Sequence, residues 1–162
     1  MRRRAILAVF LLVCAGSPAW AASVSAQFNV TATVLKNCAV SASDLAFGNY
    51  TAGSGSPVTA STTVSVTCTA ALAYTIALDG GQTTSDVTAR AMTDGLSHNL
   101  GYGLYTTNAY GTVWGDGSAG TSAVAGTGSG AAQALTVYGR IPASQFVAAG
   151  NYSDRVTVTV NY

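Results

Sequence analysis

Val24-Ser25-Ala26-Gln27-Phe28-Asn29-Val30-Thr31-Ala32-Thr33-Val34 alternates apolar and polar residues without a break. Successive side chains of a β-strand point to opposite faces, so this alternation predicts one long, half-buried strand. Its apolar face would consist of Val24, Ala26, Phe28, Val30, Ala32 and Val34. Cys38 keeps the phase of these residues, and its thiol is therefore predicted to point inward as well.

Alternating segments of the same kind recur along the rest of the chain. The clearest covers residues 58–68, where valine and alanine alternate with serine and threonine up to Cys68. Turn-forming residues separate the segments, as at Asp79-Gly80-Gly81, which is typical of tight connections between strands. We predict further strands at residues 45–47, 74–78, 100–104, 135–141 and 155–162.

The remaining stretches lack a regular period. Residues 82–99 are polar and irregular, and residues 111–130 are rich in Gly, Ser, Thr and Ala around Trp114. We expect the second stretch to be a long loop with one short strand. No segment after residue 21 has convincing helical periodicity. Many short strands separated by turn signals predict an all-β fold, and a β-sandwich in particular.

The first 21 residues have the three parts of a secretory signal peptide. A basic head of three arginines precedes an apolar stretch at residues 5–15, and Ala19-Trp20-Ala21 has the small-x-small spacing of a cleavage site. Cleavage is predicted after Ala21. An uncleaved membrane anchor is the alternative, but the apolar stretch is shorter than the roughly 20 residues that a bilayer span needs. We therefore expect an exported chain whose mature part does not insert into a membrane.

Two cysteines remain once Cys14 leaves with the signal peptide. An even number of cysteines in an exported chain favours one disulfide between Cys38 and Cys68, formed in an oxidising compartment. Closing a loop of this length stabilises a domain by about 3–4 kcal/mol in the chain-entropy treatment. Two free thiols are a weaker alternative. A metal site is weaker still, because two cysteines and one histidine do not complete a tetrahedral shell.

Charge excludes several classes of partner. The sequence contains no glutamate, and residues 22–162 carry four cations against six aspartates, a formal charge of −2. Binding to nucleic acid or to anionic lipid depends on clustered lysine and arginine. No basic patch of that kind is expected, so neither nucleic acid nor membrane is a predicted partner.

The two ends of the strand pattern point to assembly. The last alternating segment, residues 155–162, runs to the final residue and leaves no room for a strand beside it. At the other end, residues 24–34 are a spare strand ahead of the body of the domain. A sandwich without its final strand exposes an apolar groove and unpaired backbone groups, and such an edge invites strand addition by another chain.

Several segments, taken in order, resemble the spore coat protein U domain family. The opening match is Phe28 to Val34 with Cys38, and the middle one includes the run before Cys68 and Tyr74-Thr75-Ile76-Ala77-Leu78-Asp79-Gly80-Gly81. The resemblance spans essentially the whole mature chain, and the quoted segments are residues 28–34, 45–50, 64–69, 74–81, 137–143, 150–154 and 156–162.

This resemblance implies an incomplete immunoglobulin-like β-sandwich, the pilin fold, that lacks its last strand. It implies export through the periplasm by the archaic chaperone–usher route, with a periplasmic chaperone, an outer-membrane usher and other pilus subunits as partners. The expected product is a surface pilus or coat. For this chain, the resemblance implies that residues 22–36 hold the donor strand. The side chains that would fill a neighbour's groove are Val24, Ala26, Phe28, Val30, Ala32 and Val34. Residues 37–162 form the body, and the groove edge is Val156, Val158, Val160 and Tyr162.

Two other functions are alternatives to assembly. A secreted adhesin or carbohydrate-binding module would use Trp114, Tyr105 and Tyr110 as an aromatic platform, although packing is the favoured role of these rings. An enzyme would rest on Asp94, Ser97 and His98, but all three fall in one polar loop, whereas triad chemistry draws on separate elements. The aspartates sit in turn settings rather than in spaced ligand sets. We expect no catalytic residues, no metal and no cofactor.

Overall fold

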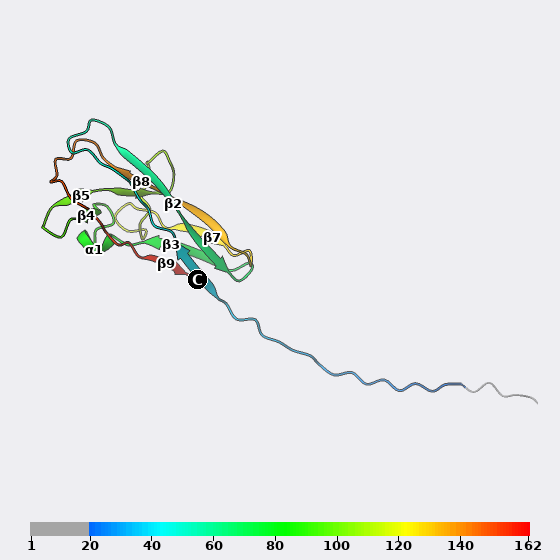
Figure 1. The fold of residues 1–162 in the computed structure, drawn as a ribbon. Coiled ribbons are helices and arrows are strands. Elements are labelled where there is room, and N and C mark those ends of the chain that lie inside the picture. The colour runs from blue at the N-terminus through cyan, green and yellow to red at the C-terminus, as the bar shows by residue number, and fades with distance from the viewer. Residues whose placement is uncertain (1–19) are drawn as a thin grey trace, which may run out of the picture. The chain divides into compact units, whose positions relative to one another are not determined.

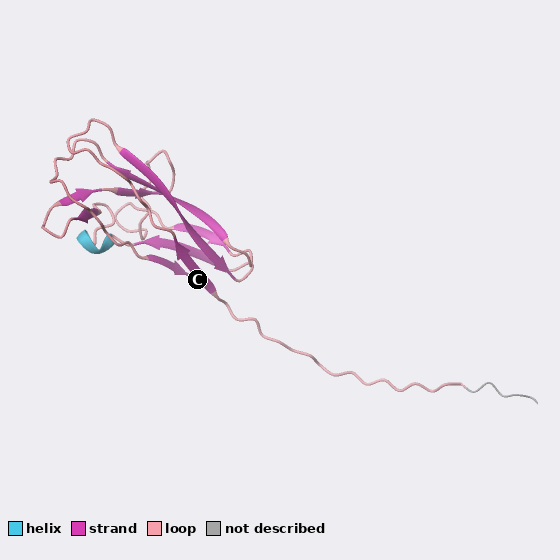
Figure 2. Cartoon of the chain, in the orientation of Figure 1, coloured by secondary structure: helices cyan, strands magenta, loops and turns pink. Residues whose placement is uncertain are grey.

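The computed structural model describes residues 20–162, which consist almost entirely of strands and their connections (Figures 1 and 2). The body, residues 34–162, is a unit of its own. Its single described helix, α1 (Gly81–Thr84), is one turn long. The strands are β1 (Cys38–Ala42), β2 (Val58–Cys68), β3 (Ala73–Leu78), β4 (Ala91–Thr93), β5 (Asn99–Gly101), β6 (Gly103–Tyr105), β7 (Val124–Thr127), β8 (Gln133–Ile141) and β9 (Val158–Asn161).

The strands pair into two main antiparallel sheets. One sheet has the order β1-β2-β8-β6 and the other the order β7-β3-β9, while β4 and β5 form a separate pair. The long strand β2 sets the register of the first sheet. Cys68 at its end lies opposite Cys38 of β1, and Val58 at its start lies opposite Ile141 of β8. The all-β prediction is confirmed.

The core lies between these two sheets and is filled by the side chains that the alternation predicted to be internal. On β2, Val64 and Val66 are buried, whereas the neighbouring Thr63 and Thr67 on the other face are exposed. Strand β3 contributes Tyr74, Ile76 and Leu78 from the opposite sheet. The buried apolar cluster is completed by Cys68, Leu100, Tyr102, Leu104, Trp114, Val137 and Ile141.

One side of the sandwich, between β6 and β7, is closed by the glycine-rich loop. Trp114 in this loop is 1% exposed, its indole donates to the Ile76 carbonyl at 3.0 Å, and its backbone amide donates to the Leu104 carbonyl at 2.9 Å. The loop therefore bonds to both sheets. The expected short strand is β7, and packing rather than sugar binding is the role of Trp114.

A buried arginine holds the same region together. Arg90 is 1% exposed, and its guanidinium donates to the carbonyls of Asp79 at 2.8 Å, Leu78 at 3.2 Å and Trp114 at 2.9 Å. Burial lowers the pKa of Arg90, while Tyr102 and Asp79 oppose that change. Charged donors make stronger hydrogen bonds than neutral ones. Arg90 thus ties the end of β3 to the closing loop, which the polar character of residues 82–99 did not reveal.

The predicted half-buried strand at residues 24–34 is not formed in the single chain. Residues 20–37 have no regular secondary structure, and Val24 and Phe28 are 99% and 85% exposed. A strand needs a neighbouring ladder to satisfy its backbone, and this segment has none among the described residues. The predicted signal peptide lies outside the described residues except for Trp20 and Ala21.

Three smaller differences concern element boundaries. Residues 45–47 are not a strand, although Leu45 and Phe47 are half-buried as the alternation requires. Both rest on the backbone of Gly139 in β8, where a Cβ would lie within 2.9 Å of their side chains. The last predicted strand begins three residues later than expected, at Val158. The helix α1 was missed because four residues are too short to show a period.

The predicted disulfide joins Cys38 to Cys68 and links β1 to β2. β1 is an edge strand, and it contacts no other strand of its sheet. The covalent bond therefore holds that strand in place at the end where it begins.

Reducing this disulfide should lower the free energy of unfolding by about 3 kcal/mol, because the unfolded chain regains the entropy of a closed loop. Thermal unfolding with and without reductant measures the effect. A Cys38→Ala/Cys68→Ala variant, insensitive to reductant, is the matched control. Equal stability of the reduced and oxidised protein would contradict a structural role for the bond.

Candidate functional site

The side of the sandwich between β1 and β9 is open. Within residues 34–162, the outer edges of these two strands have no strand partner. The Thr157 carbonyl accepts from the Asp79 amide at 3.1 Å, so Thr157 directs its backbone toward the β3 side. Alternate residues of a strand present their backbone groups to opposite edges. The groups of Val156, Val158 and Val160 consequently face the open edge.

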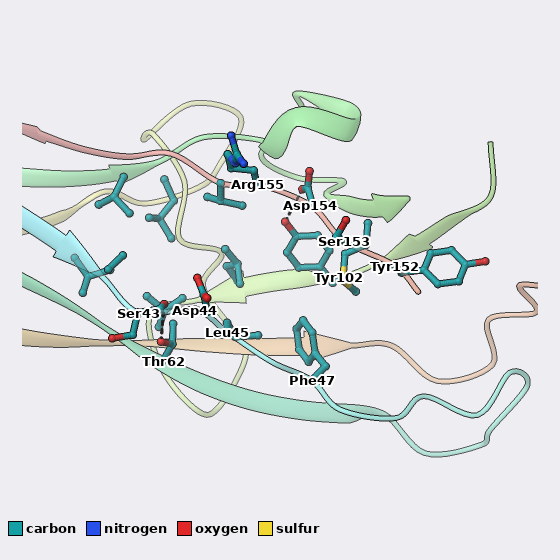
Figure 3. A pocket seen from close by; sticks show the side chains of 18 residues that line it. Ser43, Asp44, Leu45, Phe47, Thr62, Tyr102, Tyr152, Ser153, Asp154 and Arg155 are labelled. Atoms are coloured by element: carbon teal, nitrogen blue, oxygen red, sulfur yellow. Dashed lines mark hydrogen bonds between the residues drawn. The ribbon is translucent and has the colours of Figure 1, made fainter. Parts of the chain in front are cut away.

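An apolar groove runs along this open side. It encloses about 400 Å³ between residues 42–47 and residues 152–158. Figure 3 shows Leu45 and Phe47 on one wall facing Tyr102, with the 152–155 segment above. The floor is formed by core residues of both sheets, namely Val64, Leu78, Leu104 and Val137. The groove therefore opens directly onto the hydrophobic core.

A second hollow continues the groove past Phe47 and Tyr152. It encloses about 670 Å³ between residues 45–52 and residues 147–152. Leu45, Phe47, Met92 and Tyr152 line both hollows, so the two share walls. The apolar groove, together with an unpaired strand edge, is typical of a site where another chain docks.

Polar residues fix the segment that leads into β9. The Asp154 carboxylate accepts a hydrogen bond from the Tyr102 hydroxyl at 2.7 Å and from the Gln82 and Thr83 amides at 3.0 and 3.1 Å. Burial is the largest cause that raises the pKa of Tyr102, and the hydrogen bond to Asp154 is the second. The hydroxyl therefore stays protonated and donates to Asp154. A Cβ at Gly81 would overlap the Asp154 carboxylate, so glycine is required there.

A second carboxylate binds the following residues. Asp79 Oδ1 accepts from the amides of Thr157 at 2.9 Å and Gly81 at 3.0 Å. Burial raises the pKa of Asp79, but the hydrogen bonds from Thr157 and Gly81 outweigh it, and the net pKa is lowered. The sequence predicts a turn at Asp79 but carries no local signal of its bond to Thr157, 78 residues away.

The residues predicted for the groove edge separate into two groups. Val156 and Val158 line the groove. Val160 packs against the core without lining it, and Tyr162 is 56% exposed. The predicted donor residues form no strand, and the large ones, Val24, Phe28, Val30 and Val34, are all more than 80% exposed.

The residues considered for other functions lie elsewhere. His98 Nδ1 and Asp94 Oδ2 are 2.6 Å apart within one turn, where Asp94 also accepts from the Leu96 amide. The bond from His98 is the main cause that lowers the pKa of Asp94. Tyr105 and Tyr110 pack edge to face with ring centroids 5.4 Å apart. With Trp114 buried, the three-ring sugar platform is wrong, because the indole ring is inaccessible.

Within residues 20–162, no helix combines the length and apolar character needed to cross a bilayer. The same residues contain no group of three or more histidine, cysteine or acidic side chains placed to bind a metal ion.

Asp79→Asn should destabilise the body at neutral pH, because the amide lacks the charge that strengthens the bonds to Thr157 and Gly81. A carboxylate with a lowered folded pKa stabilises above its unfolded pKa of about 3.9, and this contribution disappears as the pH falls through the folded pKa. The difference in unfolding free energy between wild type and variant should therefore be constant from pH 7 to about pH 5 and shrink below about pH 4. Denaturant titrations at pH 7 and pH 3 measure it. An undiminished difference at pH 3 would refute the assignment.

Known proteins share this architecture. Thirteen chains of solved structures match it. One belongs to the crystal structure of the CsuC-CsuE chaperone–tip adhesion subunit pre-assembly complex from archaic chaperone-usher Csu pili of Acinetobacter baumannii. That chain is 26% identical with a TM-score of 0.58, and the match covers 80% of this chain but 40% of that one.

Sequence comparison assigns the family. No curated protein matches the chain. The sequence profile of the Spore Coat Protein U domain, in contrast, matches residues 24–159. This range includes the alternating N-terminal segment, both cysteines of the disulfide and the groove. The resemblance drawn from the sequence is thereby confirmed, and the chain belongs to the Spore Coat Protein U domain family.

Proposed function

We propose that this chain is a structural subunit of a surface pilus or coat, and that it polymerises by donor-strand complementation. The observation that carries the proposal is the groove between β1 and β9, whose lining reaches the core residues beside an unpaired strand edge. Residues 24–34 of another copy are the proposed occupant. They are apolar at every second position and are exposed in the single chain.

The chemistry of groove and segment is complementary. An inserted strand would pair its backbone with the free groups of Val156, Val158 and Val160, which satisfies donors and acceptors on both chains. Its apolar face would cover Val64, Leu78 and Leu104 on the floor. Burying the six apolar side chains contributes roughly 8–12 kcal/mol before the entropy of ordering is subtracted. We expect an inserted strand with this gross stabilisation to dissociate slowly.

The similarity to a chaperone-usher pilus subunit supports a proposal for the route of export. The similar structure holds a chaperone and a tip adhesion subunit of an archaic chaperone-usher pilus before assembly. We infer a periplasmic chaperone that covers the groove of this chain during export, and an outer-membrane usher that passes the subunit to the cell surface. Both partners would act on the open side, because an unpaired strand edge beside an apolar groove makes the free subunit prone to aggregation.

Deleting residues 22–34 from the mature protein should abolish polymers and leave the body folded. The full-length protein should give a ladder of multimers on SDS gels that collapses only on boiling, whereas the deletion variant should run as a monomer. A synthetic peptide of residues 22–34 added to the deletion variant should raise its melting temperature, since the peptide fills the groove.

A Phe28→Asp peptide is the matched control, because a buried carboxylate in the groove carries a large desolvation penalty. It should give little or no thermal shift. Multimers that persist without residues 22–34 would sink the donor role of this segment. A monomer band for the full-length protein, together with no peptide effect, would sink assembly itself.

A further inference from the structure

Exposed large apolar side chains have an uneven distribution on the body. Outside Trp20 and residues 24–34, the described chain has five of them, and none lies on the outer faces of the central strands β2, β3 and β8. These five are Leu35, Val40, Leu96, Phe146 and Tyr162.

Leu35, Val40 and Tyr162 share one end of the sandwich, which we call the disulfide end. Cys38 opposes Cys68 there, and β9 reaches it because Asn161 opposes Thr75 near the start of β3. Figure 1 shows the C-terminus beside the start of β1. Leu35 is 78% exposed, and it breaks the alternation of the donor segment because it follows the apolar Val34 directly.

Leu96 and Phe146 lie at the opposite end, which we call the loop end. The connections at residues 48–57 and 142–151 meet there, and the Gly53 amide donates to the Gln145 carbonyl at 2.8 Å. The loop that carries Leu96 lies beside the second connection, since a Cβ at Gly150 would lie 3.6 Å from Asp94. Phe146 is 85% exposed, yet its ring is held against Gly53, where a Cβ would lie 2.6 Å from it.

Donor insertion would bring these two ends together. Every strand pair of the body is antiparallel, and a donor antiparallel to β9 would place Val34 near Tyr152, at the loop end. Only Leu35, Lys36 and Asn37 separate Val34 from Cys38. Even fully extended, this linker spans at most about 14 Å between the two Cα atoms. The disulfide end of the donating copy must therefore lie against the loop end of the accepting copy.

We propose that the disulfide end of one copy docks on the loop end of the next, with Leu35 and Tyr162 packing against Phe146 and Leu96. This inference rests on the proposed donor-strand function and extends it from the inserted strand to the bodies. The contact joins two different surfaces of the same chain, so it does not close on itself and propagates along a fibre. It also gives a role to the exposed Leu35 and Phe146, neither of which lines the groove.

Site-specific photocrosslinking on assembled fibres tests the contact. Phe146→p-benzoylphenylalanine keeps an aromatic ring at the loop end, and irradiation should link it to a neighbouring copy at residues 34–40 or at Tyr162, as identified by mass spectrometry. Tyr138→p-benzoylphenylalanine is the matched control. Tyr138 lies on β8 between the buried Val137 and Gly139, so its ring points to the outer face of the sheet. It should give no adduct.

Two further variants repeat the test from other positions of the proposed contact. A Leu96→p-benzoylphenylalanine variant should repeat the crosslink to the disulfide end, and Leu35→Asn should reduce the yield from position 146. Boiling-sensitive multimers that form normally, but give no adduct from position 146 or 96, would overturn the end-to-end contact and leave donor insertion intact. Adducts between two loop ends would overturn it as well. If the wild-type protein forms no boiling-sensitive multimers, the donor-strand function is refuted, and this contact is refuted with it.

Discussion

The unpaired edges of β1 and β9 are the constraint on which the rest of this structure depends. A sheet edge leaves backbone donors and acceptors without partners, and here that edge stands above side chains of the hydrophobic core. The same sandwich seals its other side with a loop anchored by Trp114, whose indole and amide bond to opposite sheets. One lateral side is therefore closed within the body, and the other keeps an open strand edge.

Keeping a groove open without collapse requires rigid walls. The disulfide fixes β1 at its beginning, while Leu45 and Phe47 rest on Gly139 beyond its end. On the other wall, two carboxylates hold the backbone that leads into β9: Asp154 through Gln82 and Thr83, and Asp79 through Thr157. These contacts join distant parts of the chain, so the groove is a property of the folded body rather than of either edge strand.

Much of the fold could be predicted from the alternation because burial imposes it directly. The inward positions of β2 and β3, the pairing of Cys38 with Cys68, and the loop around Trp114 follow from local periodicity and from the count of cysteines in an exported chain. The polar anchors could not be predicted in the same way. Arg90 and Asp154 look like solvated residues in the sequence, and their partners lie 11 to 72 residues away.

The sequence by itself determined most strands of the body, the disulfide, and a donor-like segment whose apolar residues recur at every second position. In a pleated strand, spacing along the chain decides which face a side chain lies on. Only the tertiary structure decided what those strands leave uncovered. Sheet order placed β1 and β9 at neighbouring edges, and it left residues 24–34 without a ladder of their own. The physical reason is that a groove arises from contacts between segments far apart in the chain, which no local period encodes.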